Sequence, residues 1–135
     1  MVLDRSGRGD STSAPLYSSS RWPDYVTWEK RVFGISSCEV TALLLDEWRF
    51  PNEMAEAIRA HYILEPGDMD CPLAVLLNVG NGMARFVSRS FQGEDNLWEI
   101  TPEKLSAIGL TEDDFEPAIV ATEKSFEAAI LSLGN

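Results

Sequence analysis

Residues 29–62 read EKRVFGISSCEVTALLLDEWRFPNEMAEAIRAHY, and this stretch decides the fold. Ser36 and Glu39 have the S-x-x-E spacing of a capping box, which predicts that a helix begins just after Ser36. The apolar residues that follow recur at helical spacing, and we expect them on the inner face of that helix: Val40, Leu43, Leu44 and Trp48. Phe50 and Pro51 end the pattern, because proline breaks one helix and suits the first turn of the next. The stretch therefore predicts two consecutive helices joined at a tight corner.

A further helix is expected on the N-terminal side, from Pro23 to Gly34. Pro23 suits the first helical position, where its missing N–H costs nothing, and Gly34 offers a stop. The residues between them recur at helical spacing: Tyr25, Trp28, Glu29 and Val32. Residues 1–21 are rich in Ser, Thr, Gly, Asp and Arg, so we expect a flexible tail that precedes a helical domain at 22–135.

The C-terminal side continues in the same way. The helix that starts at Pro51 should end near Pro66–Gly67, with an apolar stripe of Met54, Ala57, Ile58 and Tyr62. Asp70 is expected to cap a longer helix whose buried face comprises Leu73, Leu76, Leu77, Met83, Ala84 and Val87. Gly80 and Gly82 inside that helix indicate a close approach of another segment, although each glycine costs roughly 1 kcal/mol against alanine.

Two more helices complete the chain after a polar loop at Gln92–Asn96. Thr101–Pro102 starts a short helix that Gly109 closes, and Thr111 caps the last one together with Asp114. The apolar face expected in the last helix comprises Phe115, Ile119, Thr122, Phe126 and Ala129. Because alternation with a period of two is missing, we predict an all-α fold, a compact bundle of five to six helices.

The charge balance limits the partners. The 22 acidic and 11 basic residues give a net charge of −11, which repels nucleic acid and anionic lipid head groups and leaves basic proteins as partners. No run approaches the ~20 apolar residues of a membrane span. The two cysteines, Cys38 and Cys71, show no paired spacing. These features predict a cytoplasmic protein without nucleic-acid or membrane partners.

Catalytic patterns are missing from the sequence. A metal centre needs several converging His, Cys, Asp or Glu ligands, and His61 is the one histidine and the one candidate ligand. Cys38 could pair with His61 as an activated thiol, but a cysteine beside Val40 is more often a small packing residue. The glycines at 80 and 82 lie inside a helix and do not form a dinucleotide-binding loop. We therefore expect no catalytic residue, no metal and no cofactor.

The stretch from Glu29 to Tyr62 resembles the second half of the HDOD domain, the HD-related output domain of bacterial signalling proteins. That family shows a glutamate, then G-x-x-H-x-x-x-G-A-x-L, W-x-L-P and A-I-x-x-H-H. The positions of this chain that carry the resemblance are Glu29, Gly34, Ser37, Trp48, Pro51, Ile58, His61 and Tyr62. The similarity extends weakly over residues 23–130, whereas the first half of the family pattern is not recognisable.

The departures from the family pattern fall at positions that include potential metal ligands. Ser37 stands where the family has histidine, Thr41 where it has glycine, and Tyr62 where it has the second terminal histidine. Histidines at such positions bind metal in the catalytic HD relatives, while the HDOD family is regarded as largely non-catalytic. The resemblance thus implies an HD-like, non-enzymatic signalling or regulatory module that binds a protein partner or forms a homodimer.

Two alternatives stay open at this stage. One is a metal-dependent phosphohydrolase of the HD superfamily that a second chain completes. The other is a small-molecule sensor with a pocket near Trp48 and Leu76.

Overall fold

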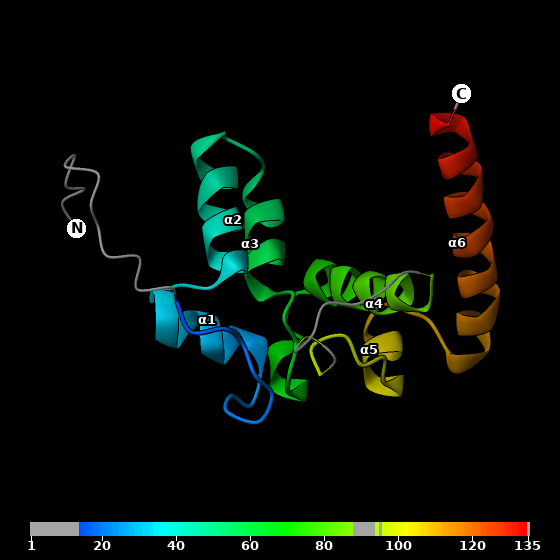
Figure 1. Cartoon of the computed structure of the whole chain (residues 1–135). Helices are drawn as coiled ribbons and strands as arrows, with labels where there is room; N and C mark the ends of the chain where they lie inside the picture. The colour runs from blue at the N-terminus through cyan, green and yellow to red at the C-terminus, as the bar shows by residue number, and fades with distance from the viewer. Residues whose placement is uncertain (1–13, 88–93, 95, 135) are drawn as a thin grey trace.

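The computed structural model describes residues 14–87, 94 and 96–134. It contains six α-helices, α1 (Tyr25–Phe33), α2 (Ser37–Glu47), α3 (Asn52–Ala60), α4 (Pro72–Val87), α5 (Pro102–Ala107) and α6 (Glu112–Leu133), and a 3-10 turn, η1 (Pro66–Asp68) (Figure 1). The described residues contain no strand, so the predicted all-α class is confirmed. Within the same residues, no helix has the length and apolar character needed to cross a membrane.

Helix α1 begins at Tyr25, two residues later than predicted. Asp24 is its N-cap, and the Asp24 carboxylate accepts hydrogen bonds from the backbone N–H and the hydroxyl of Thr27, both at 2.7 Å. The prediction of Pro23 as the first helical residue is therefore wrong, because the Asp24 side chain caps a helix whose first residue is Tyr25. The predicted stop at Gly34 is confirmed: Gly34 has φ 79°, a left-handed conformation that glycine adopts without strain.

Residues 14–21 lie against α1, although the sequence assigned them to the tail. The Trp28 indole Nε1 donates to the Pro15 carbonyl at 2.9 Å. The Tyr17 ring lies 5.4 Å from that of Tyr25 and 6.0 Å from that of Trp28. The aromatic side chains of this segment and of α1 thus form one cluster at the N-terminal end of the fold; residues 1–13 are outside the described residues.

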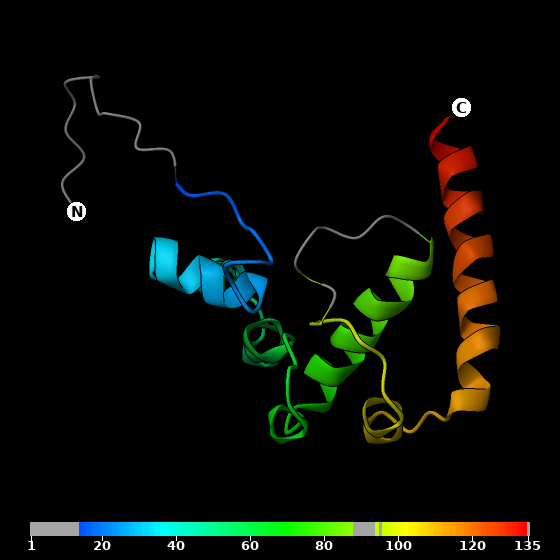
Figure 2. The same cartoon turned by 60° about the horizontal axis from the view of Figure 1, so that its bottom comes forward.

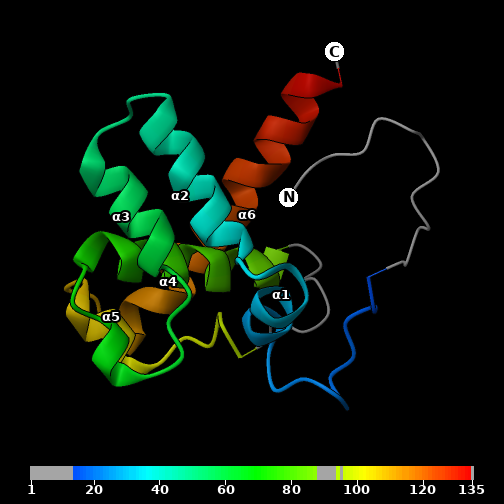
Figure 3. The same cartoon turned by 90° about the vertical axis from the view of Figure 1, so that its left-hand side faces the viewer.

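Helices α2 and α3 form an antiparallel hairpin (Figures 1 and 3). The capping box of Ser36 and Glu39 at the start of α2 is confirmed. Ala42 in α2, and Ala55 and Ala57 in α3, are 0%, 1% and 0% exposed, because such small side chains let the two backbones approach closely. The buried residues of the two helices are thus small: Cys38, Ala42, Ala55 and Ala57.

The large apolar residues of the hairpin lie on its outside. The predicted inner face of α2 is wrong, because its four members are 41–65% exposed: Val40, Leu43, Leu44 and Trp48. Trp48, expected in the core, is the most exposed of the four at 65%. Phe50 and Met54 are also exposed, so the hairpin carries six uncovered apolar side chains.

The main core lies between α4, α5 and the segment that links α3 to α4 (Figure 2). Its buried members are Ile63, Val75, Val79 and Leu105, and partly buried side chains pack around them: Met69, Met83, Ile100, Ile108 and Leu110. The face predicted for α4 is therefore rotated, because Leu73 and Leu76 are 40% and 51% exposed. The spacing of its large leucines points to one side of α4, whereas the buried side is formed by Ala74, Val75, Asn78, Val79 and Gly82.

The last helix, α6, contacts α4 and then extends beyond it (Figures 1 and 2). The predicted capping box of Thr111 and Asp114 is confirmed, and Pro117 lies inside the helix. None of the described residues of α6 is buried. The short helix α5 starts after the N-cap Thr101, and Gly109, at φ 75°, follows it as expected.

Candidate functional site

Four of the eight positions that carry the family resemblance, Glu29, Ser37, His61 and Tyr62, meet where α1, the start of α2 and the end of α3 converge. Glu29 of α1 is buried, with 7% of its surface exposed. One of its carboxylate oxygens accepts from the Ser37 backbone N–H at 3.0 Å and from the Ser37 hydroxyl at 3.1 Å. That hydroxyl also lies 3.2 Å from the phenol oxygen of Tyr62. Glu29, Ser37 and Tyr62 therefore form a hydrogen-bonded chain that joins three segments.

His61 lies beside this chain, at the C-terminal cap of α3. Its Nδ1 hydrogen bonds with the Ile58 carbonyl, and its ring stacks on that of Trp98 with 5.6 Å between centroids. The Tyr62 ring lies 4.5 Å from His61 and 5.1 Å from Trp98. Burial lowers the pKa of His61 below its usual 6.5, against the opposing effects of the Ile58 carbonyl and the Glu94 carboxylate. The imidazole is thus a packed, neutral ring at pH 7.

Burial also raises the pKa of the Tyr62 phenol, and nearby Glu94 and Glu29 act in the same direction. The hydrogen bond with Ser37 opposes that rise. The Glu94 carboxylate itself accepts from the Trp98 indole Nε1 at 3.0 Å. The phenol consequently stays protonated and can donate to an acceptor near neutral pH.

Asn78 of α4 ties this cluster to the core. It is fully buried, and its side-chain amide donates to the His61 carbonyl at 2.8 Å and to the Leu97 carbonyl at 2.6 Å. The sequence reasoning missed Asn78, Glu94 and Trp98 as members of the site. A signal was available for Asn78, because one amide within the apolar run of α4 must find partners when it is buried.

The remaining motif residues lie away from this cluster. Trp48 and Pro51 sit at the exposed turn between α2 and α3. Gly34 ends α1, and Ile58 contributes its carbonyl to the contact with His61. Cys38 is buried, with its Sγ 3.1 Å from the Ser36 hydroxyl, which is the packing role expected for it. The motif therefore divides into a polar cluster and an exposed helix corner.

The cluster offers a poor set of metal ligands. It has one imidazole, one carboxylate already hydrogen bonded to Ser37, a hydroxyl and a phenol. Across residues 14–87, 94 and 96–134, no group of three or more His, Cys, Asp or Glu side chains is placed to hold a metal ion. The residues present at these positions thus do not fit a divalent centre of the HD type.

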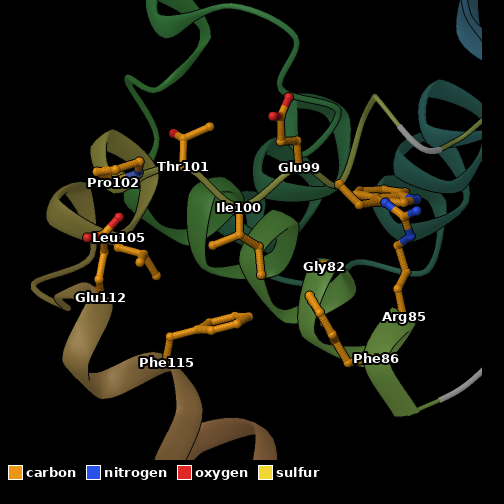
Figure 4. A pocket seen from close by; sticks show the side chains of 11 residues that line it. Gly82, Arg85, Phe86, Glu99, Ile100, Thr101, Pro102, Leu105, Glu112 and Phe115 are labelled. Atoms are coloured by element: carbon orange, nitrogen blue, oxygen red, sulfur yellow. The ribbon is translucent and has the colours of Figure 1, made fainter.

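A cavity of about 540 Å³ lies elsewhere, between α4, the segment before α5, and the start of α6 (Figure 4). Ile100, Leu105 and Phe115 point into it in Figure 4. Its lining is mostly apolar with charged groups at the edge: Gly82, Arg85, Phe86, Trp98, Glu99, Ile100, Thr101, Pro102, Leu105, Glu112 and Phe115. Neither Trp48 nor Leu76 lines it, so this cavity is not the pocket that the sequence suggested near those two residues.

Comparison with known proteins gives one match. The family model of the HDOD domain matches residues 14–64, a range that contains α1, α2 and α3 and ends before α4. The searches of curated proteins and of solved structures found no match. All eight positions that carry the resemblance lie within the matched range. The resemblance read from the sequence is therefore confirmed.

Proposed function

Residues 14–64 of this chain belong to the HDOD domain family, and from this assignment we propose that the chain is a non-catalytic signalling module that acts through protein contacts. The module would relay a signal by binding a protein partner or a second copy of itself. Its polar cluster would serve to hold α1, α2 and α3 in a fixed arrangement.

The observation that carries this proposal is the hydrogen-bonded chain of Glu29, Ser37 and Tyr62. In it the carboxylate accepts two hydrogen bonds from Ser37, and the hydroxyl in turn contacts the phenol. The polar atoms at the motif positions are therefore occupied with one another. Such mutual satisfaction is typical of a structural network, since a catalytic site needs groups that are free to engage substrate.

The exposed apolar residues of the α2–α3 hairpin support a role in contacts. They form one set on the outside of the hairpin, 41–65% exposed: Val40, Leu43, Leu44, Trp48, Phe50 and Met54. Apolar patches of this kind on a folded domain mark interaction sites. Light scattering on the purified chain tests the self-association part; a monomer at high micromolar concentration would contradict a homodimer.

Metal analysis tests the non-catalytic part against a phosphohydrolase of the HD type. We expect the chain, purified without chelator, to hold far less than one equivalent of Mn, Fe or Zn. We also expect no hydrolysis of bis(p-nitrophenyl) phosphate when these metals are added. Stoichiometric metal together with hydrolysis, both abolished by His61→Ala and kept in the exposed-site control Arg59→Ala, would refute the proposal.

A further inference from the structure

Helix α6 carries an apolar stripe that is covered at one end and uncovered at the other. The stripe recurs every three or four residues, the spacing that places side chains on one side of a helix: Phe115, Ile119, Thr122, Phe126, Ala129 and Leu133. The first three members are half-buried, and the Phe115 ring packs edge-on against Phe86 of α4 at 5.5 Å. Phe126 and Leu133 are 46% and 87% exposed, and Ile130 beside them is 52% exposed.

The uncovered half extends past α4, with no other helix of the described residues beside it (Figures 1 and 2). The same side of α6 that packs on α4 therefore continues into open space. An apolar stripe of this length in water is unfavourable unless another surface covers it.

A row of glutamates borders this stripe. It consists of Glu112, Glu116, Glu123 and Glu127, separated by four, seven and four residues, so that all four share one side of the helix. The opposite border carries small neutral residues: Ala118, Ser125 and Ser132. Lys124 is the single basic residue of α6, and its position is on the back of the helix. Of the ion pairs within the described residues, Lys30–Glu39 and Arg59–Asp46, neither involves α6.

The cavity of about 540 Å³ lies at the covered end of the stripe (Figure 4). Phe115 of the stripe and Glu112 of the acidic row both line it, next to Phe86 of α4. Its volume is in the range of pockets that hold drug-sized molecules, which leaves room for a bulky apolar side chain. The stripe, the acidic row and the cavity thus form one continuous surface.

We propose that this α6 surface binds an amphipathic helix of a partner protein, with apolar residues against the stripe and a row of Lys or Arg against the glutamates. A bulky apolar side chain of that helix would enter the cavity, in the helix-in-groove mode of recognition. This inference rests on the proposed role in protein contacts and names the chemistry of one partner.

Charge argues against a second copy of the chain on this surface. Each copy has a net charge of −11. Two α6 helices paired antiparallel through the stripe would set one glutamate row against the other, and a parallel pair would bring the two acidic first turns together. A basic helix removes that repulsion and places its cations along the glutamate row of α6, which takes part in no ion pair with the described residues.

Binding of a designed peptide tests this inference. The probe is a fluorescent helix of about 20 residues, long enough to be helical, with leucines at heptad spacing and lysines along one border. Its matched control has glutamate in place of every lysine. Fluorescence anisotropy with the full chain gives the Kd at about 50 mM and about 300 mM salt, between which surface charge interactions become largely screened.

Phe126→Glu should weaken binding of the basic peptide at least about tenfold, because it places a charge in the apolar contact. The matched control Leu131→Glu, at a residue 72% exposed on the back of the helix, should leave the Kd unchanged. Glu123→Gln and Glu127→Gln should each weaken binding about two- to fivefold at low salt only. Circular dichroism confirms that the variants fold, and the salt dependence of the unchanged chain gives a second test that needs no variant.

Several results would overturn the inference. These are equal binding of the acidic peptide, loss of binding in Leu131→Glu to the same degree as in Phe126→Glu, or a dimer of the free chain that Phe126→Glu dissociates. The proposed function fails by a different result, a metal-dependent hydrolase activity that requires His61. If the chain is metal-free and inactive but binds the peptide equally well with Phe126→Glu, only the α6 site is refuted and the proposed function stands.

Discussion

Two glycines of α4, Gly80 and Gly82, allow the effect of close packing on stability to be measured apart from that of helix propensity. A Cβ on Gly82 would lie 2.6 Å from the Trp98 carbonyl oxygen and 2.7 Å from Cγ1 of Ile100, whereas a Cβ on Gly80 would meet nothing within 4 Å. The Trp98 oxygen is a backbone atom next to a core segment, so it cannot move aside as a flexible side chain would. Gly82→Ala and Gly80→Ala are therefore the same chemical change in opposite surroundings.

The two substitutions should change the free energy of unfolding in opposite directions. Alanine in place of glycine stabilises a helix interior by roughly 0.8–1 kcal/mol, and Gly80→Ala should show most of that gain. Gly82→Ala has the same propensity gain but overpacks the contact with Trp98 and Ile100, which costs about 1–3 kcal/mol. We expect the free energy of unfolding of the two variants to differ by about 1–3 kcal/mol, with Gly82→Ala the less stable.

Urea unfolding followed by circular dichroism measures both variants against the unchanged chain. The slope of the unfolding free energy against urea should stay constant, because neither change alters the surface that unfolding exposes. If Gly82→Ala were as stable as Gly80→Ala, the close approach of residues 98–100 to α4 would be wrong. The position of the segment that lines the cavity would then be wrong as well.

Three further predictions concern α1, α2 and the polar cluster. Trp48→Ala should cost less than about 1 kcal/mol of stability in urea unfolding, because its side chain is 65% exposed, whereas Trp28→Ala, at 9% exposed, should cost about 3–5 kcal/mol. Glu29→Ala should cost about 1–3 kcal/mol, because it removes the acceptor of two hydrogen bonds, and the exposed control Glu56→Ala should be neutral; equal losses would contradict a structural role for the cluster. Since burial lowers the pKa of His61 in the folded state, the unfolded state binds its proton more readily. The contribution of His61 to stability should therefore be full above pH about 6.5 and fall below it, by at most about 1.4 kcal/mol per pH unit. In His61→Gln, the unfolding free energy should depend less on pH between about 7.5 and 5.5.

Local chemistry made most helix ends predictable, although the helix expected to run from Pro51 to near Pro66–Gly67 ends at Ala60. The capping boxes at Ser36 and Thr111 and the left-handed glycines at 34 and 109 appear where the sequence placed them. Each of these signals depends on residues within about one helical turn, so no knowledge of the tertiary fold is needed. Pro23 failed because a stronger cap, Asp24, directly follows it.

The buried faces were harder to predict, since they depend on which element arrives from elsewhere. In α2 the large residues Leu43 and Leu44 indicated one side, but α3 packs on the other side through Ala42. Small residues give a weak hydrophobic signal, although they set the distance between the two backbones. In α4 the large leucines lie away from the buried side, and the buried polar Asn78 marks the inner face better than Leu73 or Leu76 does.

The polar cluster was half predictable for a similar reason. Glu29, Ser37, His61 and Tyr62 could be grouped because a family spacing connects them. Glu94 and Trp98 belong to a separate segment, and only the fold brings that segment over His61 and Tyr62. Spacing therefore found the part of the site that lies on consecutive helices and missed the part that closes over it.

Stability and the proposed binding at α6 should be separable in this chain, because they concern different helices. The core lies between α4, α5 and the segment around Ile63, while α6 has no buried residue among those described. A substitution in the outer half of α6, such as Phe126→Glu, removes little buried surface, so it should leave the unfolding free energy nearly unchanged. Natural helices seldom keep an apolar stripe in water when it contributes little to their own fold. The stripe on α6 is therefore better explained by what binds it than by what it holds together.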